Sequence, residues 1–373
     1  MIIGVPKEIK NNEYRVGMIP ANVRELVKHN HQVLVETHAA DGIGFSDEDY
    51  RQAGAEIVVD AADIFKRADM IIKVKEPLAQ ERAMLREGQI LFTYLHLAPD
   101  LAQTQDLINS KAICIAYETV KDNHGGLPLL APMSEVAGRM SVQVGAHFLQ
   151  KMYGGRGVLL AGVTGVETAK VVVIGGGTVG RNAVQVAVGL GAETVVLDRN
   201  LDALRLIEMQ FGNSIKTIYS TAESLEKHVL EADVVIGAVL IPGASAPKLV
   251  TAEHIKKMKP GSVIVDVAID QGGCTETSRP TSHENPTYIV DGVVHYCVTN
   301  MPGAVPTTSA FALNNATLPY ILNLANKGYK QALLDDEGFL QGLNVFQGQV
   351  TNQSVAEALN LPFSDPRTAL RPV

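Results

Sequence analysis

Cysteine is scarce in this chain, and the short motifs that mark zinc and hydrolase sites are missing. Of 373 residues only three are cysteines, Cys114, Cys274 and Cys297, and they form no CxxC pair. Such a set supports neither a disulfide framework nor a zinc site, and free thiols are typical of a reducing cytosol. No HExxH motif and no GxSxG serine elbow occurs, which disfavours hydrolase chemistry. We therefore expect neither a disulfide nor a metal.

Positive charge and long apolar runs are also scarce. Lys and Arg number 32 against 40 Asp and Glu, a formal net charge of −8. Nucleic acids and anionic membranes bind clustered positive charge, so neither is an expected partner. No apolar run approaches the roughly 18 residues that span a bilayer. The opening MIIGVPKEIK has the pattern of a short strand followed by charge rather than of a signal peptide. We expect a soluble, cytoplasmic protein.

The order of apolar runs and helical patterns predicts two α/β domains. The length exceeds what one hydrophobic core usually covers, and 46% hydrophobic with 19% charged residues is typical of a well-packed enzyme-like protein. Apolar runs without strict polar alternation, separated by helical patterns, predict parallel strands with helices on both faces. The expected fold class is α/β, with two doubly wound, Rossmann-like parallel sheets and an active-site cleft between the two domains.

The expected elements form two series. The first has strands over 2–6, 32–37, 56–59, 70–75, 89–97 and 112–118, with helices over 20–30, 60–68 and 99–110. The second has strands within 169–175, 192–198, 232–240, 261–270 and 286–303. A long helix is expected over 132–152 with Ser134 as its N-cap, and a further helical pattern covers 307–333, where Pro319 should bend or interrupt it. The remaining tail is too short for a domain, and the pattern leaves open which domain it packs on.

A glycine-rich turn after the first strand of the second series predicts a dinucleotide site. KVVVIGGGTVGRNAV places Gly175, Gly177 and Gly180 in GxGxxG spacing, with Gly176 as an extra glycine. Glycines there permit a tight turn, close approach of the backbone to a pyrophosphate, and close packing of helix on strand, while the helix N-terminus faces the phosphates. The alternative is a purely structural glycine turn. The preceding apolar strand and the following helical pattern favour the dinucleotide.

An acidic residue after the next strand predicts which dinucleotide binds. Asp198 ends the run TVVLD, 18 residues beyond Gly180, about where a ribose-binding carboxylate belongs. A carboxylate accepts hydrogen bonds from a ribose 2′-hydroxyl and repels a 2′-phosphate. Although the neighbouring Arg199 could soften that repulsion, we expect NAD rather than NADP.

Charged and polar residues follow several other predicted strands. Because open parallel sheets bind ligands at the carboxyl ends of their strands, we expect these residues to meet beside the nicotinamide. Each has a structural alternative: a solvated pair with Glu76, a polar loop, a core histidine, or a plain polar strand end. Together they could hold a small charged substrate, transfer a proton and accompany a hydride transfer. The residues are Arg15, Lys75, His96 and Glu118 in the first series, and Asp270 and Asn300 in the second.

Nearly the whole chain resembles the alanine dehydrogenase family. The matching stretches include GVPKEIKNNEYRVGMIP, KVKEP, TYLHLA, APMSEVAGRMS, VDVAIDQGGC and VTNMPGAVPTTSA, together with the segment from GGRGVLL through the glycine turn. The resemblance implies NAD-dependent, reversible oxidative deamination of L-alanine to pyruvate and ammonium. It also implies that the NAD domain (131–306) is inserted into a substrate domain (1–130 plus 307–373), on which the tail packs, and that the chain forms a homo-hexamer.

The resemblance further implies roles for individual residues. His96 and Asp270 would be catalytic, Arg15 and Lys75 would hold the substrate carboxylate and carbonyl, Glu118 would support the substrate lysine, and Asn300 would lie near the substrate. Many members carry Lys or Arg where this chain has Ala203, so a cationic contact to the cofactor could be missing and NAD affinity lower. The residues implied around NAD are Gly175, Gly177, Thr178, Val179, Gly180, Ser134, Asp198, Ser220, Val239, Leu240, Val267, Ala268, Ile269, Asp270, Arg279, Val298, Thr299, Asn300 and Met301.

Rival interpretations keep the architecture but change the function. The soluble NAD-binding component of proton-translocating transhydrogenase shares this organisation, and we expect it to lack an aspartate at the position of Asp270. Opine- and saccharopine-type dehydrogenases would need room for a larger amine. A non-catalytic NAD-binding module would keep the glycine turn without turnover.

Overall fold

Two compact domains make up the chain. The computed structural model describes residues 1–239 and 246–371, and the chain divides into a first domain, residues 1–133 with the C-terminal segment from 305, and a second domain, Ser134–Ala304. Each domain contains one sheet with flanking helices, so the predicted class of two doubly wound α/β domains is confirmed. No helix among the described residues is both long and apolar enough to cross a membrane.

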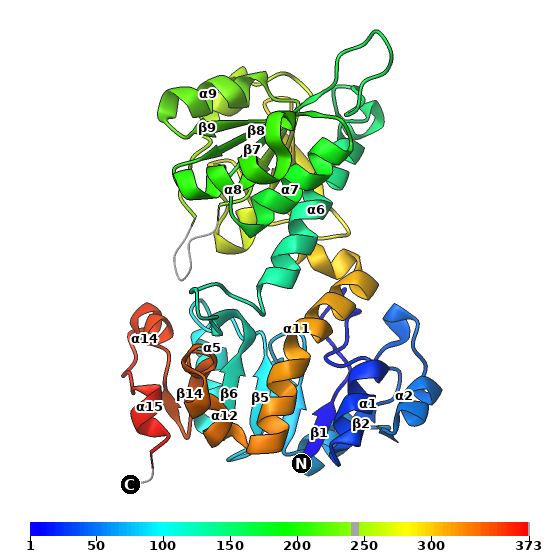
Figure 1. Cartoon of the computed structure of the whole chain (residues 1–373), viewed down its shortest axis with the longest axis vertical. Coiled ribbons are helices and arrows are strands. Elements are labelled where there is room, and N and C mark those ends of the chain that lie inside the picture. The colour runs from blue at the N-terminus through cyan, green and yellow to red at the C-terminus, as the bar shows by residue number, and fades with distance from the viewer. Residues whose placement is uncertain (240–245, 372–373) are drawn as a thin grey trace. The chain divides into compact units, whose positions relative to one another are not determined.

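The first domain is built on a sheet of eight strands in the order β15-β14-β6-β5-β4-β1-β2-β3 (Figure 1). From β6 to β3 all neighbours are parallel. The order reverses between β1 and β4, which makes this pair the switch point where such sheets bind ligands. The strands are β1 (Ile2–Val5), β2 (Gln32–Glu36), β3 (Glu56–Val58), β4 (Met70–Ile72), β5 (Ile90–Thr93), β6 (Ile113–Ala116), β14 (Leu343–Phe346) and β15 (Gln349–Val350).

Continuous apolar runs form these strands because both faces of the sheet are buried. In β2, Val33 and Val35 belong to one core cluster and Leu34 to another, as the twofold alternation of a strand requires. The helices of this domain are α1 (Pro20–Lys28), α2 (Asp47–Ala53), α3 (Ala61–Arg67), α4 (Ala79–Arg82), α5 (Leu101–Ser110), α11 (Pro306–Lys327), α12 (Tyr329–Asp335), α13 (Glu337–Leu340), α14 (Gln353–Leu359) and α15 (Pro366–Ala369).

The C-terminal segment completes the first sheet. Strand β14 pairs antiparallel with β6, and β15 pairs antiparallel with β14; Figure 1 shows β14 beside β6. The predicted helical pattern over 307–333 forms two helices, α11 and α12, separated at Gly328, and α11 continues through Pro319 without interruption. Of the expected bend or interruption at Pro319, the interruption is contradicted and the bend stays a prediction.

The second domain repeats the same winding. Its sheet has the order β12-β13-β11-β10-β7-β8-β9, all parallel except the edge strand β12. The strands are β7 (Lys170–Ile174), β8 (Glu193–Asp198), β9 (Ile215–Tyr219), β10 (Val234–Gly237), β11 (Val263–Asp266), β12 (Thr287–Val290) and β13 (Val293–Tyr296). The helices are α6 (Ala131–Phe148), which begins at the domain boundary, α7 (Thr178–Gly189), α8 (Leu201–Phe211), α9 (Ala222–Glu231) and α10 (Ala252–Lys257).

Several strands end earlier than their apolar runs suggest. Strand β4 ends at Ile72, β5 at Thr93 and β11 at Asp266, so Lys75, His96 and Asp270 lie in the segments that follow the strands rather than at their last residues. Helix α6 begins at Ala131, which places Ser134 inside its first turn. The expectation of Ser134 as an N-cap was wrong.

Candidate active site

Four neighbouring parallel strands bring the predicted residues of the first domain to one edge of its sheet. Arg15 lies in the loop after β1, Lys75 follows β4, His96 follows β5 and Glu118 follows β6. These strands are adjacent in the order β1-β4-β5-β6, and neighbouring strands lie about 4.8 Å apart. Their carboxyl ends therefore present all four residues along one edge, beginning at the switch point.

A buried guanidinium–carboxylate pair occupies the loop after β1. Arg15 is only 2% exposed, and its Nε and Nη2 donate to the two carboxylate oxygens of Glu13, each at 2.6 Å. Its Nη1 lies 3.0 Å from the sulfur of Met133. Burial disfavours the charge of Arg15, but its hydrogen bonds to Glu13 and the negative charge of Glu13 outweigh burial and raise the pKa of Arg15 above the ordinary value. Arg15 is thus a permanent cation whose plane Glu13 holds, and sequence reasoning missed Glu13.

Lys75 is mostly buried, and both its backbone N–H and its carbonyl are hydrogen-bonded. Its Nζ lies 3.8 Å from Oε2 of Glu76, and both side chains are less than one-fifth exposed, which excludes a solvated pair. Glu76 also pairs with Lys10 of the loop after β1. Burial raises the pKa of Glu76, but Lys75 and Lys10 together bring it below the ordinary value. The hydroxyl of Thr93 donates to the carbonyl of Lys75 at 3.0 Å.

His96 is a half-exposed residue in an unusual backbone conformation. Its side chain is 47% exposed, so it is not a core histidine. Its φ of 49° lies in the left-handed region, which bulky residues adopt only when their surroundings hold them there. Glu118 supplies that hold, because its carboxylate accepts the N–H of His96 at 2.6 Å and that of Leu95 at 3.2 Å. The ring of His96 stacks on Tyr94 with centroids 5.8 Å apart.

Glu118 and Tyr94 connect the charged residues of this edge. Glu118 lies 4.0 Å from Nδ1 of His96, and its carboxylate binds the segment around His96 rather than Lys75. Burial raises the pKa of Tyr94, while the charge of Arg15 lowers it and that of Glu118 raises it. The phenol of Tyr94 donates to the carbonyl of Leu129 at 2.6 Å. No pattern in the sequence singled out Tyr94 beyond its place in an apolar run.

The glycine turn of the second domain has the geometry that a pyrophosphate requires. Gly175 has φ 104°, and a Cβ on Gly180 would lie 1.8 Å from the carbonyl oxygen of Gly175. A Cβ on Gly177 would have nothing within 4 Å. Helix α7 begins at Thr178 with no side-chain cap, so its first N–H groups have no partner within the helix and the positive end of its dipole lies at the glycine turn. The turn therefore fits a dinucleotide cofactor.

The predicted ribose-binding carboxylate lies against this turn. Asp198 ends β8, and its two carboxylate oxygens accept the N–H of Gly176 at 2.5 Å and of Asn200 at 2.7 Å. The N–H of Ser220, which follows β9, donates to the carbonyl of Asp198. Val239 follows β10, and its amide nitrogen would lie 3.1 Å from a Cβ on Gly175. The predicted cofactor residue Leu240 lies outside the described residues.

Helix α6 packs on the start of α7. A Cβ on Gly138 would lie 2.2 Å from the carbonyl oxygen of Val179, so the two helices approach closely there. The side chain of Arg139 donates to Asn182 of α7 at 2.9 Å. Ser134 lies one turn before Gly138 on the same face of α6, and its role at the cofactor stays a prediction.

A buried aspartate that sequence reasoning missed organises the segment carrying Asp270. Asp266 closes β11, is 1% exposed, and accepts hydrogen bonds from the N–H groups of Cys274 and Thr275 and from the hydroxyl of Ser278. Asp270 is exposed, on the short 3₁₀ helix Val267–Gln271 that follows. The same helix contains the predicted cofactor residues Val267, Ala268 and Ile269.

The remaining predicted cofactor residues lie on two adjacent segments. Arg279 is exposed, with its guanidinium carbon 4.0 Å from the ring centroid of Tyr288. The segment after β13 runs beside it, because Thr281 bridges to Val298. Asn300 has φ 59°, and its carbonyl accepts the N–H of Gly303. Along this segment Val298 and Met301 are buried and Thr299 is exposed.

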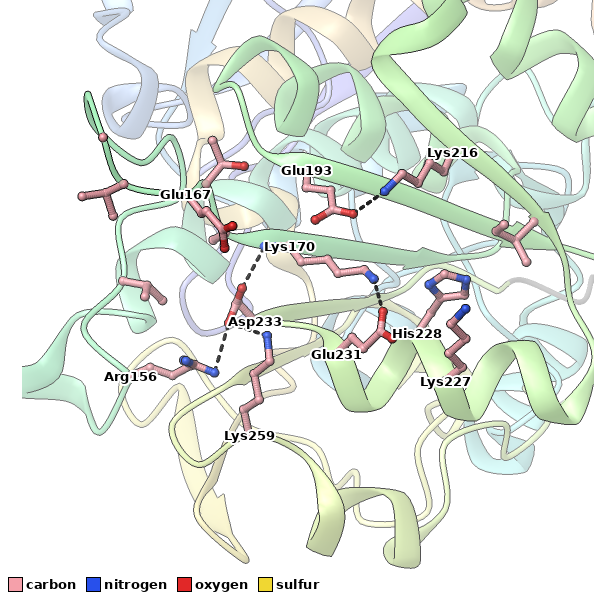
Figure 2. Close-up of a pocket in the computed structure, with 16 residues that line it drawn as sticks. Arg156, Glu167, Lys170, Glu193, Lys216, Lys227, His228, Glu231, Asp233 and Lys259 are labelled. Atoms are coloured by element: carbon pink, nitrogen blue, oxygen red, sulfur yellow. Dashed lines mark hydrogen bonds and ion pairs between the residues drawn. The ribbon is translucent and has the colours of Figure 1, made fainter.

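A polar hollow of about 910 Å³ lies at the opposite edge of the second sheet (Figure 2). Lys170, Glu193, Lys216 and Asp233 lie at or just before the amino ends of β7, β8, β9 and β10. Its cations are largely neutralised: Lys170 pairs with Glu231, Lys216 with Glu193, and Arg156 and Lys259 with Asp233. The hollow is therefore an ion-pair network remote from the glycine turn. Among the described residues, no cluster of His, Cys, Asp or Glu could hold a metal ion.

The fold and the glycine turn define a two-domain, Rossmann-type α/β protein, and comparisons with known proteins specify the family. Residues 4–137 match the model of the alanine dehydrogenase/PNT N-terminal domain, and residues 141–353 match that of the C-terminal domain. The alanine dehydrogenase of Halomonas elongata is 57% identical, covering 97% of this chain and 98% of that protein. That of Mycolicibacterium smegmatis is 53% identical, with 98% of each covered.

Solved structures agree with this assignment. An L-alanine dehydrogenase structure matches with a TM-score of 0.93 at 53% identity, covering 96% of this chain and 99% of that one. A transhydrogenase from Sinorhizobium meliloti matches with a TM-score of 0.82 at 26% identity, covering 95% and 100%. The chain belongs to the alanine dehydrogenase/PNT family.

Proposed function

We propose that this chain catalyses the NAD-dependent, reversible oxidative deamination of L-alanine to pyruvate and ammonium. The observation that carries the proposal is near-full-length identity of 53–57% to alanine dehydrogenases of two organisms. The charged edge formed by Arg15, Lys75 and His96 supports it, because a small amino acid needs a cation for its carboxylate and a group that moves protons.

NAD is the proposed cofactor, and the second domain supplies its binding groups. The glycine turn and the start of α7 would hold the pyrophosphate, and Asp198 would accept hydrogen bonds from the ribose hydroxyls. When bound, NAD would supply the acceptor for the hydride that leaves Cα of alanine. The other residues assigned to the cofactor are Ser134, Ser220, Val239, Leu240, Val267–Asp270, Arg279 and Val298–Met301.

The substrate groups come from the charged edge of the first domain. We assign the substrate carboxylate to Arg15, whose guanidinium plane Glu13 holds. Lys75 would stabilise negative charge that develops on the substrate oxygen, the kind of preorganised electrostatic effect that often dominates catalysis. Asn300 is assigned to the substrate as well. Glu118 is assigned to this group through its contacts with the His96 segment.

His96 and Asp270 are the proposed catalytic pair. The substrate ammonium loses one proton to solvent and a hydride leaves Cα, which gives an iminium. Water then adds to the iminium carbon to give a carbinolamine. His96 takes a proton from the attacking water and returns one as ammonium departs, while Asp270 orients the reacting groups. Exposure of the His96 ring is consistent with exchange of its proton with solvent.

A transhydrogenase component is the second candidate, favoured only by the weaker structural match at 26% identity. Asp270, which we expect that component to lack, supports the dehydrogenase. The test follows NADH absorbance with pyruvate plus ammonium and with pyruvate alone. Oxidation that requires ammonium supports the proposal. Activity without ammonium, transfer only between two nucleotides, or no turnover would refute it.

The cofactor preference has its own test. Asp198 should repel the 2′-phosphate of NADPH, so kcat/KM with NADH is expected to exceed kcat/KM with NADPH by tenfold or more. A tenfold effect is about what one charge-assisted hydrogen bond contributes. The matched variant Asp198→Asn keeps an acceptor oxygen for Gly176 but removes the repulsion. Asp198→Asn should therefore lower the ratio of kcat/KM with NADH to kcat/KM with NADPH. A wild-type preference for NADPH would contradict the assignment of NAD.

We also propose that the chain acts in the cytoplasm as a homo-hexamer. Apolar side chains on the segment around the Val163–Val166 bridge support self-association, because Leu159, Val163 and Val166 are each at least 60% exposed, and exposed apolar patches mark interaction sites. Light scattering on a size-exclusion column should give six times the chain mass. The variant Val163→Asp/Val166→Asp should give a smaller species. A monomeric wild type would contradict the proposal.

A further inference from the structure

A buried carboxylate, which is assigned no role above, joins the loop that carries Arg15 to the segment that carries Lys75. Glu8 lies in the loop after β1 and is 6% exposed. Its Oε1 accepts the N–H of Val74 at 2.6 Å and that of Lys75 at 3.3 Å. Its Oε2 accepts a hydrogen bond from Nζ of Lys73 at 2.9 Å.

Lys73 balances this carboxylate from the end of β4. Lys73 is fully buried, and its Nζ lies 2.8 Å from Glu81 as well as 2.9 Å from Glu8. Glu81 in turn accepts the N–H of Leu78 at 2.8 Å. Burial raises the pKa of Glu8, and Lys73 opposes that effect. Lys73, Glu8 and Glu81 thus form a buried cluster of one cation and two carboxylates that binds the backbone of residues 74–78.

Net stability alone does not account for such a group. A buried ion pair generally adds little over apolar side chains of similar size, because desolvation offsets the attraction. What an apolar pair could not do is bind two successive backbone N–H groups of the Lys75 segment. The outer face of the same segment is tied to the same loop, since Lys10 pairs with Glu76. Both contacts cross the switch point between β1 and β4.

We propose that Glu8 is a positioning residue for Lys75: it fixes the segment 73–75 against the loop of Arg15, so that the two cations assigned to the substrate keep a set separation. The proposal rests on the proposed function, in which Lys75 and Arg15 bind the substrate. Glu8 is not a catalytic residue, because it contacts the Lys75 backbone and not the substrate.

The test compares Glu8→Gln with the matched control Glu36→Gln. Glu36 is a half-buried carboxylate of the same domain that accepts the N–H of Lys7 at 2.8 Å. It senses the charge of Lys73 but accepts no backbone N–H of Val74 or Lys75, which Glu8 does. In Glu8→Gln a single amide oxygen faces three donors. We expect KM for pyruvate to rise about tenfold or more, since small displacements of binding groups cost one to two orders of magnitude. The KM for NADH should stay within about twofold, and Glu36→Gln should resemble wild type.

A second variant separates positioning from folding. Glu8→Asp keeps the charge opposite Lys73 but withdraws the oxygens by one methylene from Val74 and Lys75. It should therefore raise KM for pyruvate with a melting temperature near that of wild type, even if Glu8→Gln proves unstable. An unchanged pyruvate KM in Glu8→Asp, or equal losses for pyruvate and NADH in both Glu8 variants, would overturn the proposal.

Lys75→Met distinguishes failure of this inference from failure of the proposed function. If Lys75→Met raises KM for pyruvate but Glu8→Asp does not, Lys75 binds substrate and the positioning role of Glu8 is wrong. If Lys75→Met leaves KM for pyruvate unchanged, the substrate assignment itself fails. The inference about Glu8 then falls with it.

Discussion

His96 shows how one residue's surroundings define its role. Its sequence context is an apolar run, and that run alone cannot distinguish a core histidine from one at the rim of a site. The structure ends β5 at Thr93, turns the backbone to a φ of 49° at His96, and holds that conformation through Glu118. The half-exposed ring that results can reach both a ligand and solvent, as proton transfer requires.

The first prediction concerns this imidazole. His96→Ala should lower kcat for ammonium-dependent NADH oxidation by about 10²–10⁴, the range typical of general acid–base groups. His124→Ala, a change of an exposed histidine in the same domain, serves as the control and should leave kcat within about twofold. Steady-state kinetics with saturating substrates measure both. Loss of less than tenfold in His96→Ala would remove it from the proton-transfer role.

Two aspartates show a limit of residue-level reasoning. The apolar run within 261–270 predicts a buried strand that Asp270 closes, and a carboxylate at the end of a buried strand needs a partner. The strand ends four residues earlier, and the carboxylate that satisfies the argument is Asp266, which three donors of the following loop surround. The physical rule was correct, but the register of the strand end was not available from an apolar run.

At the scale of elements, the glycine turn was predictable because all of its determinants lie within one contiguous segment. An apolar strand, three spaced glycines and a helical pattern specify strand β7, the turn and helix α7 without reference to distant residues. Two of these glycines, Gly177 and Gly180, nevertheless have different roles. Gly180 has no room for a side chain inside the protein, whereas Gly177 faces open space.

The second prediction separates these two glycines. In Gly180→Ala the new methyl group would meet the carbonyl of Gly175 at 1.8 Å, so overpacking should lower the free energy of unfolding by about 1–3 kcal/mol and weaken NADH binding. In Gly177→Ala the methyl group would stand where the pyrophosphate should approach. Thermal unfolding should stay near wild type while NADH affinity, followed by fluorescence titration, falls. Equal melting temperatures for the two variants would contradict this division.

For the whole molecule, acid sensitivity should be set in part by buried histidines of the second domain. His295 is fully buried between the carbonyl of Val293 and the hydroxyl of Thr277. Burial lowers its pKa below the ordinary 6.5, only partly opposed by that carbonyl and by Asp266. As the pH falls, His295 of the unfolded chain therefore binds a proton near pH 6.5, whereas His295 of the folded chain is still neutral at that pH. Stability should therefore fall as the pH drops below about 6.5 and be fully present above it.

The third prediction tests that linkage. His295→Gln removes the titrating group, so the loss in melting temperature between pH 8 and pH 5.5 should be smaller than in wild type. The exposed His124→Gln variant should keep the wild-type loss. An unchanged pH dependence in His295→Gln would show that other groups determine acid unfolding. Its melting temperature at pH 8 reports separately on the lost hydrogen bonds.

The sequence by itself determined the α/β class, the two sheets and the glycine turn, because periodicity and motif spacing are properties of contiguous residues. The family resemblance, not the spacing, implied most residues of the proposed site. Only the tertiary structure decided where strands end, that β14 joins β6, and that Glu8 binds Val74 across 66 positions. These features depend on which strands become neighbours, and that choice follows from packing between distant segments. Local patterns describe each strand, but contacts across the sheet decide what lies beside it.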